Sequence, residues 1–228
     1  MELISGFDGY NRSLEGFRQL RLEGVMYIPS SIDVTFQEMR VKVDGVTALS
    51  EMAIWNLYLL AKQSLSVEGN FFECGVDRGG SAIFLADLMR GKGKKLFLFD
   101  TFSGMPECEV EKDFHKVGDF PDSLLPALRN VLSGVDFIEY KQGFIPDTFK
   151  GMENEKIAFA HVDVDSYQSV KDCLEFIFPR MVKGGVILID DYGQPTTIGC
   201  ILATDEYFKD KKSVPIPFIH GGAMVMKL

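Results

Sequence analysis

The sequence predicts an α/β protein built on a doubly wound, mostly parallel sheet of seven strands, with an antiparallel hairpin at its C-terminal end. Two observations predict this class. From residue 70 onward, short apolar runs alternate with segments of helical periodicity. The runs are continuously apolar, as expected of parallel strands covered on both faces by right-handed crossover helices. Residues 1–45 lack this alternation, so we expect an N-terminal extension there and a domain over 46–228.

Each element follows from its local pattern. A helix is expected after Thr47, which can cap it, and further helices over 81–90, 122–132, 167–181 and 198–208. Helix Arg12–Leu22 and an extended piece Met26–Pro29 are expected in the extension. The expected strands are 71–74, 95–100, 136–140, 157–163, 186–190, 214–219 and 223–227.

Composition and charge exclude several classes of function. The net charge is −9 without a basic tract, which argues against nucleic acid as a partner. No apolar run is long enough for a membrane span, and the first residues lack the pattern of a signal peptide. The cysteines, Cys74, Cys108, Cys173 and Cys200, are scattered without a Cys-x-x-Cys pair, as expected of reduced core thiols. We therefore expect a cytoplasmic protein.

A glycine-rich turn follows the first predicted strand. Glu73 and Gly75 begin the pattern Glu-x-Gly-x-x-x-Gly, which ends at Gly79 and leads through Ser81 into a helix. Glycines allow close approach of a ligand to the backbone, and the helix N-terminus offers free N–H groups. The alternative is a tight turn without a ligand. Thr47 has the same two interpretations, a helix cap or a ligand contact.

Acidic residues end four of the predicted strands. Asp100, at the end of the second strand, can accept both hydroxyls of a ribose through its two oxygens; the alternative is a solvated turn acid. Asp163-Val164-Asp165 and Asp190-Asp191 end two neighbouring strands, so three or four carboxylates should crowd one small volume. An oxygen-only cluster suits a hard cation, Mg²⁺ above all. The alternative is that some of these carboxylates cap helices, Asp165 in particular.

For the three histidines, the sequence favours structural or surface roles over catalytic ones. His161 lies inside a predicted strand and fits a core residue whose polar atoms are satisfied. His115 fits a solvated loop residue, although it could meet a substrate, and His220 fits a hairpin.

Together these motifs resemble the macrocin O-methyltransferase (TylF) family. The segments that carry the resemblance are Glu73–Ser81, Asp100–Pro106, Gly118–Phe120, Gly143–Phe149, His161–Ser169 and Asp190–Gly193. It extends from about Thr47 to the C-terminus; Asp77 departs from it, where the family often has an aromatic residue. The resemblance implies a Rossmann-like class I methyltransferase domain that binds S-adenosylmethionine. It further implies methylation of a hydroxyl on a sugar or phenol of a natural product, in some members with Mg²⁺.

The resemblance also implies roles for individual residues. Glu73 and Gly75 would approach the methionine part of the cofactor, Asp100 its ribose, and the Gly143–Phe144 region its adenine. The expected cofactor-binding residues are Thr47, Glu73, Gly75, Gly79, Ser81, Asp100, Thr101, Phe102, Gly143, Phe144 and Asp163. Asp163, Asp190 and Asp191 are the expected metal ligands, and Asp165 is the expected base.

The surroundings of the site give further expectations. The loop Thr101–Pro121, with Phe102, Met105, Phe114 and His115, would form a lid or a wall for the acceptor. Residues 1–45 would serve as a lid or as a contact in a homo-oligomer. Two other functions stay open at this point. The first is a nicotinamide-dependent oxidoreductase, but the Gly-x-Gly-x-x-Gly motif typical of that class is missing from this sequence. The second is a non-catalytic binding or assembly protein, which would not need the carboxylates at the strand ends.

Overall fold

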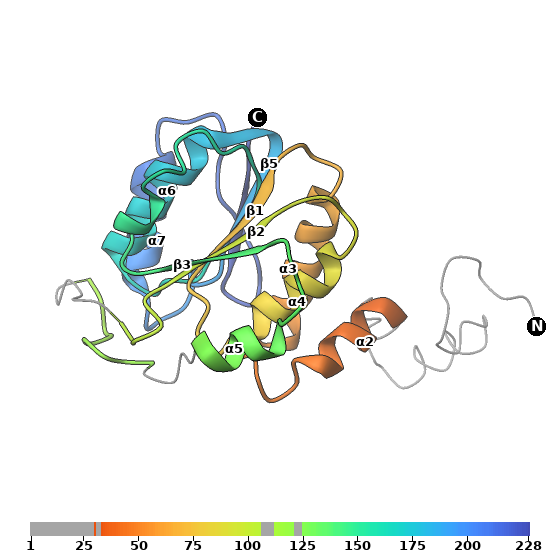
Figure 1. Cartoon of the computed structure of the whole chain (residues 1–228). Coiled ribbons are helices and arrows are strands. Elements are labelled where there is room, and N and C mark those ends of the chain that lie inside the picture. The colour runs from red at the N-terminus through yellow and green to blue at the C-terminus, as the bar shows by residue number, and fades with distance from the viewer. Residues whose placement is uncertain (1–29, 31–32, 106–111, 121–124) are drawn as a thin grey trace, which may run out of the picture. The chain divides into compact units, whose positions relative to one another are not determined.

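The structure is a computed structural model that describes residues 30, 33–105, 112–120 and 125–228 (Figure 1). The chain divides into two compact units, Met1–Asp44 and Gly45–Leu228. In the first unit, helix α2 (Val34–Lys42) begins after Asp33, whose Oδ1 accepts a hydrogen bond from the Phe36 N–H at 2.9 Å. The sequence patterns did not predict this helix. The helix and extended piece predicted before residue 30 lie outside the described residues.

The second unit is built on one seven-stranded sheet with the order β3-β2-β1-β4-β5-β7-β6. The strands are β1 Asn70–Cys74, β2 Leu96–Asp100, β3 Ile138–Gln142, β4 Ile157–Val162, β5 Met181–Ile189, β6 Ile216–Pro217 and β7 Ala223–Met226. The first five strands pair in parallel, and β7 pairs antiparallel with both β5 and β6. The predicted fold class, including the C-terminal hairpin, is therefore confirmed.

Helices cover both faces of this sheet. They are α3 Glu51–Ser64, α4 Gly80–Met89, α5 Leu125–Val131, α6 Tyr167–Arg180 and α7 Ile198–Phe208, with a short 3₁₀ turn, η2, over Asp147–Phe149. Figure 1 shows α3 and α4 on one side of the sheet and α6 and α7 on the other. None of the helices in the described part of the chain has the length and apolar character needed to cross a membrane.

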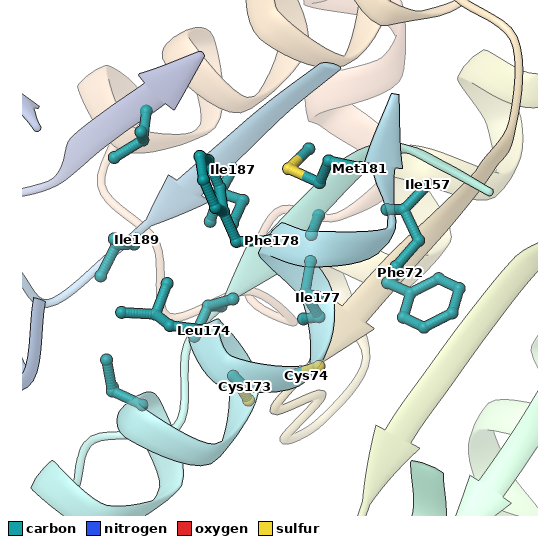
Figure 2. Packing of buried hydrophobic residues seen from close by; sticks show 14 of the residues in the cluster. Phe72, Cys74, Ile157, Cys173, Leu174, Ile177, Phe178, Met181, Ile187 and Ile189 are labelled. Carbon is teal, nitrogen blue, oxygen red and sulfur yellow. The ribbon is translucent and has the colours of Figure 1, made fainter. Parts of the chain in front are cut away.

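The core explains why the strands are apolar on both faces. Beneath α6, Phe72 and Cys74 of β1 pack with Ile187 and Ile189 of β5 and with Leu174 of the helix (Figure 2). Strand residues between these point to the opposite face, and they are buried as well, because helices cover that face too. Cys74, Cys173 and Cys200 are buried free thiols, as predicted, whereas Cys108 lies outside the described residues.

Some predicted boundaries were wrong. Helix α3 is capped by Ser50, whose hydroxyl accepts from the Ala53 N–H at 3.2 Å. Thr47 instead accepts from the Leu49 N–H at 3.1 Å and stabilises a turn ahead of the helix. Strand β6 comprises only Ile216–Pro217, because a proline cannot donate to a continuing ladder.

Gly75 connects the fold to the site. Its φ is +85°, and a Cβ there would lie 1.7 Å from the backbone oxygen of Asp163. We expect Gly75→Ala to lower the free energy of unfolding by more than the roughly 1–3 kcal/mol of left-handed backbone strain alone. Gly91→Ala is the matched control, since Gly91 has φ +71° and open space around it. Chemical denaturation measures both variants, and equal losses would show that the close approach of the two strands is unimportant.

Candidate active site

A cavity of about 360 Å³ opens at the carboxyl ends of the central strands. Eleven of the predicted site residues line it: Thr47, Gly75, Ser81, Asp100, Thr101, Gly143, Phe144, Asp163, Asp165, Asp190 and Asp191. Ser50, Phe120, Gln194 and His220 also line the cavity, and of these only Phe120 belongs to a segment predicted near the site, the loop Thr101–Pro121. They lie far apart in the sequence, so no local motif could have grouped them.

Three predicted cofactor residues do not line the cavity. Gly79 is the N-cap of α4, and its missing Cβ makes room for the side chain of Leu128. Phe102 is 9% exposed, behind Thr101. Glu73 is fully buried, with Oε1 3.1 Å from Nδ1 of His161. These three residues therefore lie outside the lining of the cavity, and their contact with a cofactor stays a prediction.

The glycines of the turn serve packing within the protein. Gly75 lies against the backbone of Asp163, and a Cβ on Gly80 would collide with Thr47. The absent side chains thus let strand and helix approach other parts of the chain. Thr47 reaches the cavity because its backbone rests on the N-terminus of α4 at Gly80.

Asp100 organises the glycine-rich turn. Its Oδ2 accepts hydrogen bonds from the N–H groups of Val76 at 2.7 Å and Asp77 at 3.2 Å. Its Oδ1 accepts from the Phe102 N–H at 2.6 Å. The solvated-acid alternative is wrong, because the carboxylate joins two loops at the edge of the cavity. Each carboxylate oxygen can accept more than one hydrogen bond, so both can still meet a ligand.

Three aspartates come together at the other side of the cavity. One oxygen each from Asp163, Asp165 and Asp191 lies within 4.8 Å of the others. Asp190 lines the cavity but is not part of this group. Oδ1 of Asp190 and Oδ2 of Asp191 are buried without a hydrogen-bond partner among the described residues. Buried carboxylate oxygens without partners are the chemistry that a hard cation satisfies.

The electrostatics of this cluster agree with its geometry. Burial raises the pKa of Asp163 well above its usual range, and the carboxylates of Asp190 and Asp191 raise it further. Burial also raises the pKa of Asp191, with Asp165 and Asp190 as the next causes. Negative charges this close destabilise one another unless a proton or a cation is shared among them.

Asp165 does not cap helix α6. Ser166 is the N-cap, and its hydroxyl accepts from the Ser169 N–H at 3.4 Å. Asp165 has φ +57°, and the Ser166 N–H donates to the Val164 carbonyl at 2.7 Å, so Asp165 lies at the apex of a tight γ-turn. The capping alternative is therefore wrong, and the carboxylate is free to face the cavity.

Backbone strain is concentrated around the cavity. The non-glycine residues with positive φ in the described part of the chain are Asp77, Phe102, Phe120 and Asp165. Three of them line the cavity and Phe102 adjoins it. Strain of this kind costs about 1–3 kcal/mol per residue and is typical of functional sites.

Two of the three histidines differ from their sequence-based interpretations, whereas His220 lies in the hairpin between β6 and β7, as expected. His161 is buried against Glu73 and its Nε2 has no partner among the described residues, so it is only half satisfied. His220 lines the cavity, and its Nδ1 lies 3.0 Å from the amide nitrogen of Asn56 on α3. Burial lowers the pKa of His220, which favours the neutral ring.

His115 lies against Asp165. Its Nε2 is 3.9 Å from Oδ1 of Asp165, and the side chain is 20% exposed, so it is not a solvated surface residue. Of the other loop residues predicted to form the acceptor wall, Met105 lines the cavity and Phe114 is largely exposed.

Two solved structures of similar fold are O-methyltransferases by title. The O-methyltransferase NovP matches with a TM-score of 0.71 and 22% identity, over 80% of this chain and 82% of that chain. TomG of Streptomyces achromogenes, whose structure contains S-adenosylmethionine, matches with a TM-score of 0.57 and 15% identity, over 87% and 94% of the two chains. These likenesses establish the fold.

Curated relatives share more sequence. The 8-demethyl-8-(2,3-dimethoxy-alpha-L-rhamnosyl)-tetracenomycin-C 4'-O-methyltransferase of Streptomyces olivaceus is 33% identical over 55% of this chain and 54% of its own length. Mycinamicin III 3''-O-methyltransferase of Micromonospora griseorubida is 31% identical over 62% of this chain and 61% of its own length. The match thus spans between half and two thirds of each relative.

The family model for macrocin-O-methyltransferase (TylF) matches residues 59–224, which contain β1 to β6, the start of β7 and every cavity aspartate. This match covers most of the chain, and it agrees with the family suggested by the sequence motifs. The chain belongs to the macrocin-O-methyltransferase (TylF) family.

Proposed function

We propose that this protein transfers a methyl group from S-adenosylmethionine to a hydroxyl of a small-molecule acceptor, most simply a sugar of a glycosylated natural product. One observation carries the proposal: a glycine-rich turn held by Asp100 and a partly buried carboxylate cluster line the same cavity. Family membership and the names of the curated relatives support the reaction and the kind of acceptor.

The cavity fits the cofactor in three parts. Asp100 would accept the ribose hydroxyls through the lone pairs that its backbone contacts leave open. Phe144, which is 54% exposed beside Gly143, offers an aromatic face for adenine. Gly75, Ser81 and Asp163 line the cavity near the N-terminus of α4, where the methionine end would lie.

The carboxylate cluster fits Mg²⁺. Asp163 and Asp191 would hold the ion, with Asp190 beside them, because these carboxylates crowd one edge of the cavity. The buried Oδ1 of Asp190 and Oδ2 of Asp191 lack partners among the described residues. A bound Mg²⁺ supplies a Lewis acid that lowers the pKa of an acceptor hydroxyl and orients it.

The chain's own residues perform the remaining steps. Asp165 would take the proton of the hydroxyl as its oxygen attacks the methyl carbon and the bond from that carbon to sulfur breaks. Met105 and Phe120 line the cavity and would limit the access of water to a bound acceptor. Holding oxygen and methyl carbon in line supplies much of the rate through proximity.

The two alternative functions are less well supported. The family match argues against a nicotinamide-dependent oxidoreductase, and the buried, strained carboxylates argue against a protein that only binds. The test is a screen of glycosides, free sugars, nucleotide-linked sugars and catechols for methyl transfer, with and without Mg²⁺. Cofactor binding without turnover of any acceptor would favour the non-catalytic alternative.

The role of residues 1–45 remains a proposal, as a lid or a contact in a homo-oligomer. Light scattering of the full chain and of a variant that begins at residue 46 compares their oligomeric states, while turnover of each variant tests the lid.

Asp100→Ala should weaken binding of S-adenosylmethionine. Each lost hydrogen bond to a charged group costs roughly 1.5–3 kcal/mol, and the turn at Val76 and Asp77 also loses its acceptor. Calorimetric titration measures the affinity, and thermal unfolding checks that the domain stays folded. Asp147→Ala is the control, because Asp147 is an exposed acid paired with Lys150 away from the cavity. An unchanged affinity would remove Asp100 from the cofactor site.

A further inference from the structure

The segment 112–120 is anchored at both ends. Near its start, Oδ1 of Asp113 accepts from the Tyr167 N–H at the first turn of α6 at 2.9 Å. Near its end, the Asp119 carbonyl accepts from the Met105 N–H at 2.8 Å, and the Gly118 N–H donates to the Met105 carbonyl at 3.0 Å. The backbone of this segment is therefore tied to α6 at one end and to Met105 at the other.

His115 lies between these anchors, with a carboxylate at each ring nitrogen. Nδ1 is 3.4 Å from Oδ2 of Asp119, and Nε2 is 3.9 Å from Oδ1 of Asp165. The ring also packs on Phe120, with the ring centroids 5.1 Å apart. Oδ2 of Asp119 is itself held by the Lys116 N–H at 2.9 Å. The chain of contacts thus runs from the loop backbone through Asp119 and His115 to Asp165.

We propose that His115 is a positioning residue for Asp165, and that Asp119 orients the His115 ring. Asp165 sits at the apex of a strained turn, where few backbone contacts determine the direction of its side chain. An imidazole 3.9 Å from Oδ1 would bias the direction of the Asp165 carboxylate, which lines the cavity. His115 itself does not line the cavity, so it acts through Asp165 and not on the substrate.

This role rests on the proposed methyl transfer, so one experiment tests the contact without any ligand. The chain has three histidines, and ¹⁵N-histidine labelling of the full-length protein gives a correspondingly simple imidazole spectrum. His115→Gln identifies the His115 signals. Asp165→Asn and Asp119→Asn should each shift both ring nitrogens of His115, whereas Asp147→Asn should leave them unchanged. Unshifted signals in the first two variants would overturn the proposal.

A second experiment tests the role in the reaction. His115→Gln should lower kcat roughly 10–100-fold, the loss typical of partners that orient a functional side chain. The KM for the acceptor and the affinity for S-adenosylmethionine should stay unchanged. Lys116→Gln, at an exposed neighbour on the same segment, is the matched control and should retain full activity.

The double variant decides between positioning and a general effect on the loop. If His115 acts only through Asp165, adding His115→Gln to Asp165→Asn should cause no further loss. If the rate losses of the two single variants multiply in the double variant, the positioning role is overturned. If the parent protein turns over no acceptor while the imidazole signals respond to Asp165→Asn, the reaction is refuted and the contact is supported.

Discussion

Asp165→Asn should lower the rate of methyl transfer in a single turnover by about 10²–10⁴-fold, the usual cost of losing a general base. Asparagine tolerates left-handed backbone, so the turn at φ +57° should persist. Helix α6 should also be unaffected, because Ser166 caps it. The loss should therefore lie in the chemical step, and calorimetry should find nearly unchanged binding of S-adenosylmethionine.

The Asp163→Asn variant distinguishes the effect of losing a metal ligand from the effect of losing the base. Its loss of rate should be partly recovered by added Mg²⁺, because a weakened site is refilled at higher concentration, whereas extra Mg²⁺ should not restore Asp165→Asn. Single-turnover rates as a function of Mg²⁺ concentration provide the comparison. If Asp165→Asn transfers methyl at the parent rate, Asp165 is not the base.

Removal of divalent metal should abolish activity, and Mg²⁺ should restore it. Asp163, Asp165 and Asp191 bring three carboxylates together, and Oδ2 of Asp191 is buried without a hydrogen-bond partner among the described residues. Such a cluster is stabilised by a bound cation. Activity is measured after dialysis against a chelator and again after addition of Mg²⁺. Full activity in excess chelator would refute metal dependence and leave Asp165 as the activating group.

The same cluster predicts a pH effect that needs no substrate. The pKa values of Asp163 and Asp191 are raised in the folded protein, so the folded chain binds more protons than the unfolded chain above the ordinary aspartate pKa of about 4. The free energy of unfolding of the metal-free protein should then fall as the pH rises from that value through the raised pKa values. Mg²⁺ should offset this fall.

Thermal unfolding across this pH range, with and without Mg²⁺, measures the effect. Asp191→Asn should remove most of the response to Mg²⁺, and Asp147→Asn should retain it, since Asp147 is exposed outside the cavity. A stability that rises with pH in the metal-free protein would contradict the raised pKa values.

The sequence by itself determined the sheet and the edge at which the site lies. Continuous apolar runs specify strands that are buried on both faces, and parallel strands bring their carboxyl ends to one edge. Asp100, Asp163 and Asp190 each end or directly follow such a run, so their approach to one cavity followed from the strand pattern alone.

Only the tertiary structure decided what each side chain does at that edge. Glu73 occupies a motif position, yet its side chain is buried in the helix-covered sheet, where it meets His161 of the neighbouring strand. Gly75 and Gly79 make room for other parts of the chain, and Asp165 faces the cavity because Ser166 takes the cap. His115 meets Asp165 across 50 positions of sequence, through a loop anchored at α6. Local patterns reflect backbone preference and burial, whereas contacts between distant segments depend on how the whole chain packs.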